Sequence, residues 1–434
     1  MKTAYLAYGT RSPFAKAGTD LKTVHAAELG RHALAELIAR SNLSHEHWGK
    51  IVDEVIIGNT GTPADAANIS RVIALRAGLP ENVSAYTVHR NCASAMEAMA
   101  QATLKVQAGQ GDVFIAGGAE SMSQMPLMYN NKATSFFDKL SRARSLADRL
   151  KVLKDIPLKD FLKPRIAIME GLTDPFYDIN MGETAEIIAK EFGIKRNEQD
   201  EFALWSHQKA VKAQEAGHYA NEIAPYSVPP KFENTLTNDS GPRANQSMEA
   251  LAKLRPFFDK KFGSITAGNS CPITDGACMV SIVSEEGLAK LEGAKAIAKI
   301  TGYAFAGLDP RRMGLGPVFA TKKLLDQTGE KLQDFDVIEI NEAFSAQVIG
   351  CLRAFESQKF FDEHFNGDKA MGAIAPERLN PNGGAIAIGH PVGATGARIA
   401  LTAALEMNRL GAKKALATMC IGGGQGGSIS LEAV

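Results

Sequence analysis

The sequence has little of what would place it in several large classes of protein. It contains five cysteines in 434 residues, and none of them forms a CxxC pair, so neither a disulfide framework nor a structural zinc site is expected. No apolar run approaches the roughly 18 residues that a membrane-spanning helix requires. Lys plus Arg and Asp plus Glu both number 48, so no positive excess points to nucleic acid. These absences favour a globular protein in a reducing compartment.

A secretory signal is not expected at the beginning of the sequence. The first residues, MKTAYLAYGTRSPF, include Lys2 but no apolar core of roughly seven residues or more. The expected localisation is therefore cytoplasmic. The enrichment that is present is glycine, with 40 residues gathered in a few loops.

Two pairs of segments indicate an internal duplication. The runs DEVIIGN at residues 53–59 and DVIEINE at 336–342 both begin with an acid and both have the length of a buried strand. Each half also contains a small-residue helix followed by a second strand: 93–108 then 112–118, and 393–410 then 413–420. The distance between equivalent segments exceeds half the chain, so the first half must contain an insertion.

The insertion is predicted at residues 123–263, where strands and helices cease to alternate. The N-terminal half then covers residues 1–122 and continues at about 264–294, and the C-terminal half covers 295–434. Buried strands separated by helices predict that each half is a layered α/β unit with a largely parallel sheet.

Cys92 is the first candidate for chemistry. It lies in YTVHRNCASAMEA, between a β-branched run and a strong helix-forming segment, which places it at a helix N-terminus. A buried core cysteine is the common alternative. A free thiol with a pKa of about 8.5 is only about 3% ionised at neutral pH, and a helix dipole lowers that pKa by less than one unit. A nucleophilic Cys92 therefore needs a base.

His390 is the candidate base. It lies in NPNGGAIAIGHPVGATG, residues 380–396, whose glycines permit close approach of backbone to a ligand, although they also suit simple tight turns. Cys420 begins the glycine loop CIGGGQGG, which lacks the Lys and Ser or Thr of a phosphate-binding loop. Bare backbone N–H groups there favour an oxyanion site, with Cys420 as an acid or base. Asn341 follows a buried strand, where it faces a cleft or merely caps a helix.

The motifs NCASA, NEAF, GGAIAIGHPVGATG and CIGGGQGG, in this order, resemble those of the thiolase family. The resemblance spans nearly the whole chain, from RSPFAKAG through GGAESMS and ITAGNS to the final glycine loop, and is nearest to the β subunit of the fatty-acid-oxidation trifunctional complex and its bacterial counterparts. It implies a duplicated α-β-α-β-α layered fold with an inserted loop domain. It also implies thiolysis of 3-ketoacyl-CoA in fatty acid β-oxidation.

By resemblance, the catalytic roles fall on five residues. Cys92 would take the acyl group, His390 would activate it, and Cys420 would shuttle protons. His390 and, through a water, Asn341 would polarise the thioester oxygen of the acetyl-CoA enolate. The N–H groups of Cys92 and Gly422 would form a second oxyanion site. Carbon–carbon cleavage needs a nucleophile and then an enolate site, so no metal and no cofactor beyond the substrate CoA are expected.

The resemblance also suggests residues that bind CoA. These are Met181, Arg243, Ser264, Ala267 and Cys271. Cys271 stands where many thiolases have a serine that contacts pantetheine, so a weaker hydrogen bond is expected there.

Alternative functions and partners follow from the same resemblance. A biosynthetic acetoacetyl-CoA thiolase would share the site, and a non-catalytic lipid-carrier or scaffold subunit would share the fold. The retained catalytic positions argue against the scaffold. Expected partners are a second copy of the chain in a homodimer or larger assembly, and a subunit with hydratase and dehydrogenase activity.

Residues 130–165 carry ten Lys or Arg and four Asp in a neutral protein. Phe136, Leu140, Ala143, Ala147 and Leu150 follow helical spacing, which predicts one helix with an apolar stripe and basic faces. A solvated helix packed on its own domain is one interpretation. Peripheral contact with an anionic membrane, or with the partner subunit, is the other.

Overall fold

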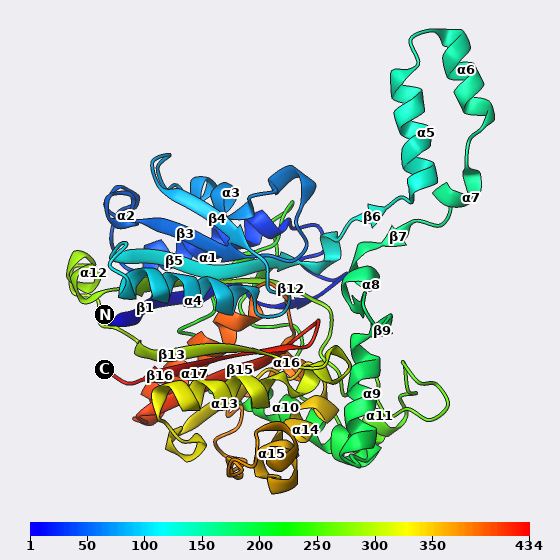
Figure 1. Ribbon diagram of the computed structural model, residues 1–434. Coiled ribbons are helices and arrows are strands. Elements are labelled where there is room, and N and C mark those ends of the chain that lie inside the picture. Colours follow the sequence, from blue (N-terminus) through cyan, green and yellow to red (C-terminus); the bar gives the residue numbers. More distant parts are fainter.

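The strands of both halves join in one central sheet in the computed structural model, which describes all 434 residues (Figure 1). The first half supplies β1 (Ala4–Arg11), β2 (Ala15–Lys16), β3 (Glu54–Gly58), β4 (Ser84–Val88), β5 (Val113–Ser121) and β12 (Thr274–Val283). The second half supplies β13 (Ala298–Gly307), β14 (Val337–Ile340), β15 (Lys414–Ile421) and β16 (Gln425–Glu432). Their order is β4-β3-β5-β12-β1-β13-β16-β15-β14, with β2 beside β12.

The predicted duplication is confirmed, because the paired segments occupy equivalent places in the two halves. Residues 53–59 contain β3 and residues 336–342 contain β14, and each lies parallel to the later strand of its pair, β5 or β15. The sheet as a whole is not largely parallel, however. β12 runs antiparallel to β1 and β5, and β16 runs antiparallel to β13 and β15.

The prediction of a largely parallel sheet was wrong because of the connections between the strands. Only three residues, Gly422–Gly424, separate β15 from β16, and so short a link permits an antiparallel hairpin but no crossover. Strands covered on both faces have continuous apolar runs whichever way they point, so their composition did not reveal the direction.

Helices form three layers: one lies between the two halves of the sheet, and one covers the outer face of each half. The core between the two halves is built from α4 (Ser94–Gln107) and α17 (Thr395–Leu410), which contact strands of both. A second core joins α1 (Ala26–Arg40), α2 (His45–Ile51) and α3 (Ile69–Arg76) to the outer face of the first half, and α12 (Glu285–Lys290) follows β12. A third joins α13 (Gly316–Thr328), α14 (Ser345–Glu356) and α15 (Gln358–His364) to the second half. The result is the expected α-β-α-β-α layering, with the blue and cyan half above the yellow and red half in Figure 1.

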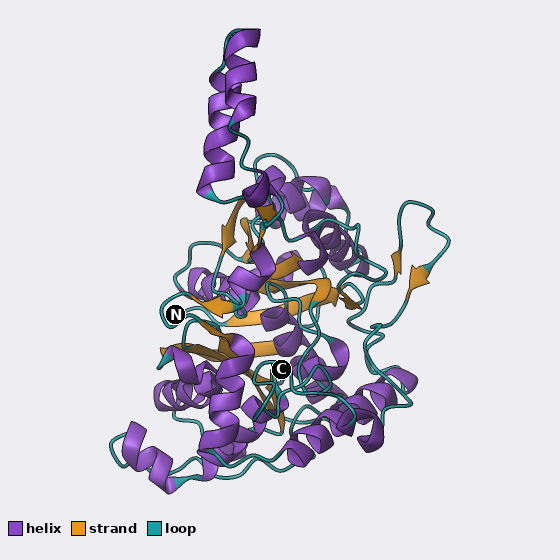
Figure 2. Ribbon diagram, turned by 90° about the vertical axis from the view of Figure 1, so that its right-hand side faces the viewer, coloured by secondary structure: helices purple, strands orange, loops and turns teal.

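The segment between β5 and β12 contributes mostly helices and short two-residue strands. It contains β6 (Leu127–Met128), α5 (Asn131–Arg142), α6 (Leu146–Lys154), α7 (Leu158–Phe161), β7 (Arg165–Ile166), α8 (Ala167–Gly171), β8 (Thr173–Asp174), β9 (Ile179–Asn180), α9 (Met181–Glu191), α10 (Arg196–Glu215), β10 (Tyr226–Ser227), β11 (Thr235–Leu236) and α11 (Met248–Ala252). Helices α9 and α10 pack on the second half, and α5 and α6 project from the molecule as a hairpin (Figures 1 and 2). No helix is both long and apolar enough to cross a membrane.

The prediction of one helix over residues 130–165 is wrong, because two helices, α5 and α6, occupy this segment. Ala143 has an extended backbone and ends α5, and the Ser145 hydroxyl then accepts from the Asp148 N–H to begin α6. The apolar stripe is therefore divided: Phe136 is buried, whereas Ala147 and Leu150 are exposed. The Ser-x-x-Asp spacing was the local signal for a second helix start.

Arg11 joins the first half to the inserted segment. Its buried guanidinium donates to Glu222 at 2.7 Å and makes two bonds with Asp239, at 2.6 and 2.8 Å. All three side chains are at most 2% exposed. Arg11 is thus the cation that forms ion pairs with both buried carboxylates.

Replacing Arg11 by Met should destabilise the protein by roughly 3–5 kcal/mol, because it leaves two buried carboxylates unpaired. Chemical denaturation would measure the loss. Arg31→Met is the matched control, since the bond of Arg31 to Glu28 is partly exposed and should contribute less than about 1 kcal/mol. Equal losses in both variants would contradict this interpretation.

Candidate active site

Cys92 lies where the chain turns from β4 into α4. Asn91 adopts the left-handed backbone conformation (φ 44°), and its side-chain amide donates to the Gly422 carbonyl at 2.7 Å. This bond ties the Cys92 turn to the glycine loop between β15 and β16. The two halves of the duplication therefore meet at the half-buried Cys92 side chain.

Burial raises the pKa of the Cys92 thiol, while the neighbouring backbone of Gly422 and of Cys92 itself opposes that rise. The thiol is thus protonated near neutral pH. Gly422 therefore lies beside Cys92, and the use of their N–H groups as one oxyanion site stays a prediction. Such a pair of donors is the arrangement that an oxyanion site needs.

Cys420 lies at the end of β15, fully buried. Burial raises the pKa of its thiol well above the usual value, and negative charge on Cys92, Cys351 or Cys271 would raise it further. Cys420 and Cys92 therefore lie within electrostatic range of each other. A thiol held protonated in this way can give up a proton only to a strong base, such as a developing enolate.

His390 has a defined tautomer. The Thr395 hydroxyl donates to the Pro391 carbonyl at 2.9 Å, so it can only accept from His390 Nδ1, which lies 2.6 Å away. The proton is thus on Nδ1, and buried Nε2 carries a lone pair with no partner in the protein. Burial, together with the charge of Arg398, lowers the pKa of His390 to about 3. The ring is neutral and able to accept a proton at Nε2.

Asn341 follows β14, and its backbone N–H donates to the Thr418 carbonyl at 3.0 Å. Its side-chain oxygen and nitrogen are both buried and have no protein partner. Residues 270–273 link the NEAF segment that begins with Asn341 to His390. Ser270 pairs with Phe344 at the end of NEAF, and Ile273 pairs with His390 itself. The helix-cap interpretation of Asn341 is therefore unsupported, since its side chain caps nothing.

Comparisons with known proteins agree with this arrangement. The family model for the thiolase N-terminal domain matches residues 4–286, and that for the thiolase C-terminal domain matches residues 294–433. The chain belongs to the thiolase family. The expectation of an enzyme of this family is thereby confirmed.

Thiolase relatives cover the chain almost completely. A 3-ketoacyl-CoA thiolase of Yersinia enterocolitica is 38% identical over 98% of this chain and 95% of its own length. The crystal structure of the Bacillus anthracis acetyl-CoA acetyltransferase has a TM-score of 0.85 at 35% identity, covering 100% of this chain and 99% of its own. Human mitochondrial 3-ketoacyl-CoA thiolase in complex with CoA has a TM-score of 0.84 at 32% identity, covering 100% and 98%.

The residues predicted to bind CoA are distributed unevenly around this thiolase site. Met181 begins α9 and lies against the glycine loop, since a Cβ built on Gly422 would lie 3.3 Å from its sulfur. Cys271 donates its N–H to the Ala343 carbonyl at 3.0 Å, and burial raises the pKa of its thiol to about 12. Both therefore lie beside the cluster.

The other three residues predicted to bind CoA make none of the contacts described for Met181 and Cys271. The Ser264 hydroxyl is engaged by Glu186 on α9 and Gln199 on α10, at 3.1 and 2.9 Å. Ala267 is exposed nearby, and Arg243 lies in a loop next to His207. Their roles remain predictions.

Two buried carboxylates that position the site were not predicted. Glu342 of NEAF accepts from Ser206, Asn380 and the Ile386 N–H, and so fixes the loop that leads to His390. A Cβ on Gly384 would lie 2.2 Å from the Glu342 carboxyl carbon, so this loop requires glycine there. The signal available in the sequence was the adjacency of Glu342 to Asn341.

Glu120 performs the same task from the first half. It accepts from the backbone N–H groups of Thr60, Gly61 and Gly393, at 2.9, 3.0 and 3.0 Å. Gly393 lies between His390 and the helix that follows. Gly118 makes the approach possible, since its Cβ would lie 1.9 Å from the Gly393 carbonyl oxygen.

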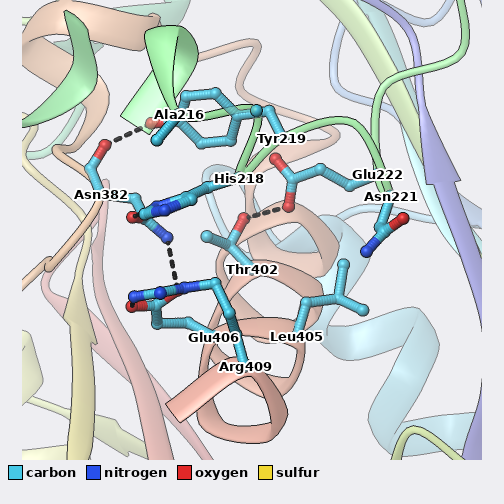
Figure 3. Close-up of a pocket in the computed structure, with 11 residues that line it drawn as sticks. Ala216, His218, Tyr219, Asn221, Glu222, Asn382, Thr402, Leu405, Glu406 and Arg409 are labelled. Atoms are coloured by element: carbon cyan, nitrogen blue, oxygen red, sulfur yellow. Dashed lines mark hydrogen bonds and ion pairs between the residues drawn. The ribbon is translucent and has the colours of Figure 1, made fainter. Parts of the chain in front are cut away.

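A separate polar cavity lies beside α17, away from these residues (Figure 3). Its volume is about 200 Å³, and Glu222, Asn382, Thr402, Glu406 and Arg409 are among its lining residues. Asn382 donates to Glu406, and Thr402 donates to Glu222. None of Cys92, Asn341, His390 and Cys420 lines it. No group of three or more His, Cys, Asp or Glu side chains is arranged to hold a metal.

Alkylation of Cys92 by iodoacetamide should depend on His390. At pH 7.5 the wild type should react at least tenfold faster than His390→Gln, because general-base assistance typically contributes about 10²–10⁴. In His390→Gln the rate should rise with pH until the thiol ionises unaided, since burial raises the pKa of Cys92. Mass spectrometry of the Cys92 peptide would follow the reaction. Equal rates and equal pH profiles would remove His390 as the base.

Proposed function

We propose that the chain cleaves 3-ketoacyl-CoA with CoA, giving acetyl-CoA and an acyl-CoA two carbons shorter, as a step of fatty acid β-oxidation. The observation that carries this proposal is the bond from the Asn91 amide to the Gly422 carbonyl, which holds the glycine loop against the Cys92 turn, beside the buried thiol of Cys420. A thiol with oxyanion donors and a second thiol are what thiolysis requires. CoA enters as a substrate, and no other cofactor takes part.

In the first half-reaction His390 Nε2 takes the Cys92 proton, and the sulfur adds to the 3-keto carbon while the N–H groups of Cys92 and Gly422 bind its oxygen. Collapse breaks the bond between the α and β carbons and leaves the acyl group on Cys92. The electron pair goes to the enolate of acetyl-CoA. His390, now carrying a proton on Nε2, and Asn341 through a water stabilise the enolate oxygen, and Cys420 donates the proton that completes acetyl-CoA.

In the second half-reaction the Cys420 thiolate takes the proton of an incoming CoA thiol. The CoA sulfur attacks the acyl group on Cys92, and the Cys92 sulfur leaves and regains its proton from His390. Each group returns to its starting state, so the protons circulate within the site.

The proposed cycle predicts a thioester on Cys92. Incubating the protein with 3-ketoacyl-CoA without free CoA should add the shortened acyl mass to the Cys92 peptide. Cys420→Ser should retain this acylation far better than Cys92→Ser, because only the latter lacks the nucleophile. Labelling confined to Cys420, or loss of labelling in both variants, would contradict the assignment.

A biosynthetic acetoacetyl-CoA thiolase is the second candidate, favoured by the similarity to the Bacillus anthracis acetyl-CoA acetyltransferase. The same residues serve condensation and cleavage. Rates of thiolysis on substrates of four to sixteen carbons distinguish them, because a biosynthetic enzyme favours the four-carbon substrate alone. Absence of thiolysis at every length would instead support a non-catalytic subunit.

We also propose that two chains associate. The sheet ends at β4, whose outer edge pairs with no strand, whereas the opposite end, β14, is covered by a bridge from Ile338 to Leu379. A free edge of this kind favours pairing with another strand, and a second copy of the chain offers one. A further subunit with hydratase and dehydrogenase activity is proposed as a partner of this assembly.

We propose in addition that the hairpin of α5 and α6 docks on an anionic lipid surface in the cytoplasm. Of the 24 exposed large apolar side chains, twelve lie in residues 127–169, among them Leu146, Leu150 and Leu153. An open cleft of about 520 Å³ between the helices is lined by Lys132, Lys139 and Lys151. Apolar area beside cations suits an interface of acyl chains and phosphate headgroups.

Phe161 packs the two arms of the hairpin together. Its ring centroid lies 5.5 Å from that of Tyr129, 5.6 Å from that of Phe136 and 5.2 Å from that of Phe137. These edge-on contacts stabilise the base of the hairpin independently of the helix tips. Charge changes at the tips therefore leave its fold intact.

Reversing four charges, Lys139, Arg142, Arg144 and Arg149 to Glu, should weaken binding to phosphatidylglycerol vesicles more than tenfold, because each well-placed cation contributes about 1 kcal/mol. Co-sedimentation at low and high salt would measure this. The control reverses four exposed lysines outside the hairpin: Lys22, Lys50, Lys359 and Lys369. Unchanged vesicle binding by the hairpin variant would overturn the lipid proposal, and loss of partner-subunit binding instead would identify a protein interface.

A further inference from the structure

Buried polar atoms without a protein partner gather in one part of the molecule. Thirteen such side-chain atoms exist, and six belong to Glu339, Asn341, His390 and Arg398. These four residues come from only two segments, the end of β14 and the stretch from His390 into the first turns of α17. Isolated orphaned groups of this kind cost free energy, so a cluster of them in one place calls for a reason.

The end of β14 presents Glu339 and Asn341 on one face. Val337 belongs to the core between the two halves, whereas Ile338 and Ile340 belong to the core on the opposite side of the sheet. Side chains alternate along a strand, so Glu339 and Asn341 point the same way as Val337, toward the layer that contains α17.

The first turns of α17 present the matching face. Thr395 and Arg398 are three residues apart and so share one side of the helix. Thr395 holds His390 Nδ1, and Arg398 Nη1 donates to Glu339 Oε2 at 3.1 Å. Both members of that ion pair are 1% exposed. One buried pair thus connects the strand that carries Asn341 to the helix that fixes His390.

Stability alone does not explain this pair. Burying two charges costs more than apolar packing of the same volume unless every polar atom finds a partner. Arg398 Nε and Nη2 and Glu339 Oε1 find none in the protein. Together with the amide of Asn341 and Nε2 of His390 they supply both donors and acceptors, which is the environment that ordered water occupies.

We propose that Arg398 and Glu339 are positioning residues, which set the spacing between Asn341 and His390 and hold the water that orients the Asn341 amide. They touch no substrate. They act through the end of β14 and the first turns of α17. This inference rests on the proposed thiolysis and deepens it, since it assigns the enolate site a supporting pair behind its two donors.

Arg398→Met should lower kcat for thiolysis about 100-fold, because a misplacement near 1 Å costs about that much in a preorganised site. KM for CoA and for 3-ketoacyl-CoA should stay within about threefold, since no binding group changes. Arg398→Lys, which keeps the charge, should recover to within about tenfold of wild type. Glu339→Gln, which keeps the shape, should also lower kcat with little change in KM.

Thr402→Val is the matched control. Thr402 lies one turn beyond Arg398 on the same face of α17, is 2% exposed, and donates to Glu222 at 2.8 Å (Figure 3). Its loss removes a buried hydrogen bond outside the catalytic groups. Thr402→Val should lower Tm by a few degrees and leave kcat and KM unchanged.

Alkylation of Cys92 by iodoacetamide is the readout that does not depend on thiolysis. It should slow in Arg398→Met, where His390 is misplaced, and remain at the wild-type rate in Thr402→Val. A wild-type kcat and alkylation rate in Arg398→Met would overturn the proposal. So would an equal loss in Thr402→Val, or a rise in KM without a fall in kcat. If the wild type cleaves no 3-ketoacyl-CoA, the proposed function fails, and the alkylation rates alone decide the role of the pair.

Discussion

The burial of the Cys92 thiol is the constraint on which the arrangement of the site depends. Burial of the sulfur raises its pKa, so the thiolate that a nucleophile requires is disfavoured at the place where it must form. The surrounding structure compensates with fixed donors and a neutral base. The backbone of Gly422 opposes the rise in the pKa of the sulfur, and His390 is held by Thr395 in the tautomer that leaves Nε2 bare. Burial also protects a thioester from water.

Neither half of the duplication builds this site alone. The first half contributes Cys92 and Glu120, and the second contributes Asn341, His390 and the glycine loop. The halves come close enough because glycine leaves room for backbone to meet backbone, as at Gly118 against Gly393 and at Gly396 against Met96. A methyl group at either contact would separate the halves by more than a catalytic hydrogen bond tolerates. The glycine content of the loops is thus a requirement of packing as much as of turn geometry.

Rigid support behind the site comes from buried carboxylates. Glu120 anchors the turn after His390, and Glu342 anchors the loop before it. A charged group in such surroundings is stable only when several donors converge on it, so each carboxylate determines the path of the backbone around it. The inserted segment takes part through Ser206 on α10, which donates to Glu342. The loop that carries His390 is thereby held from three separate regions of the chain.

By itself the sequence determined the duplication and the layered fold, and it named the residues of the candidate site. Strand length and apolar content are local, and the order of the motifs around Cys92, Asn341, His390 and Cys420 is readable along the chain. Strand direction was misjudged, because a strand covered on both faces has the same composition in either orientation, and the helix predicted over 130–165 divides at Ala143. Only the tertiary structure revealed Glu120, Glu342 and the Arg398–Glu339 pair, and it alone separated Arg243 from the contacts of Met181 and Cys271. Their partners lie tens to hundreds of residues away, and a local pattern carries no record of which distant backbone donor a buried carboxylate meets.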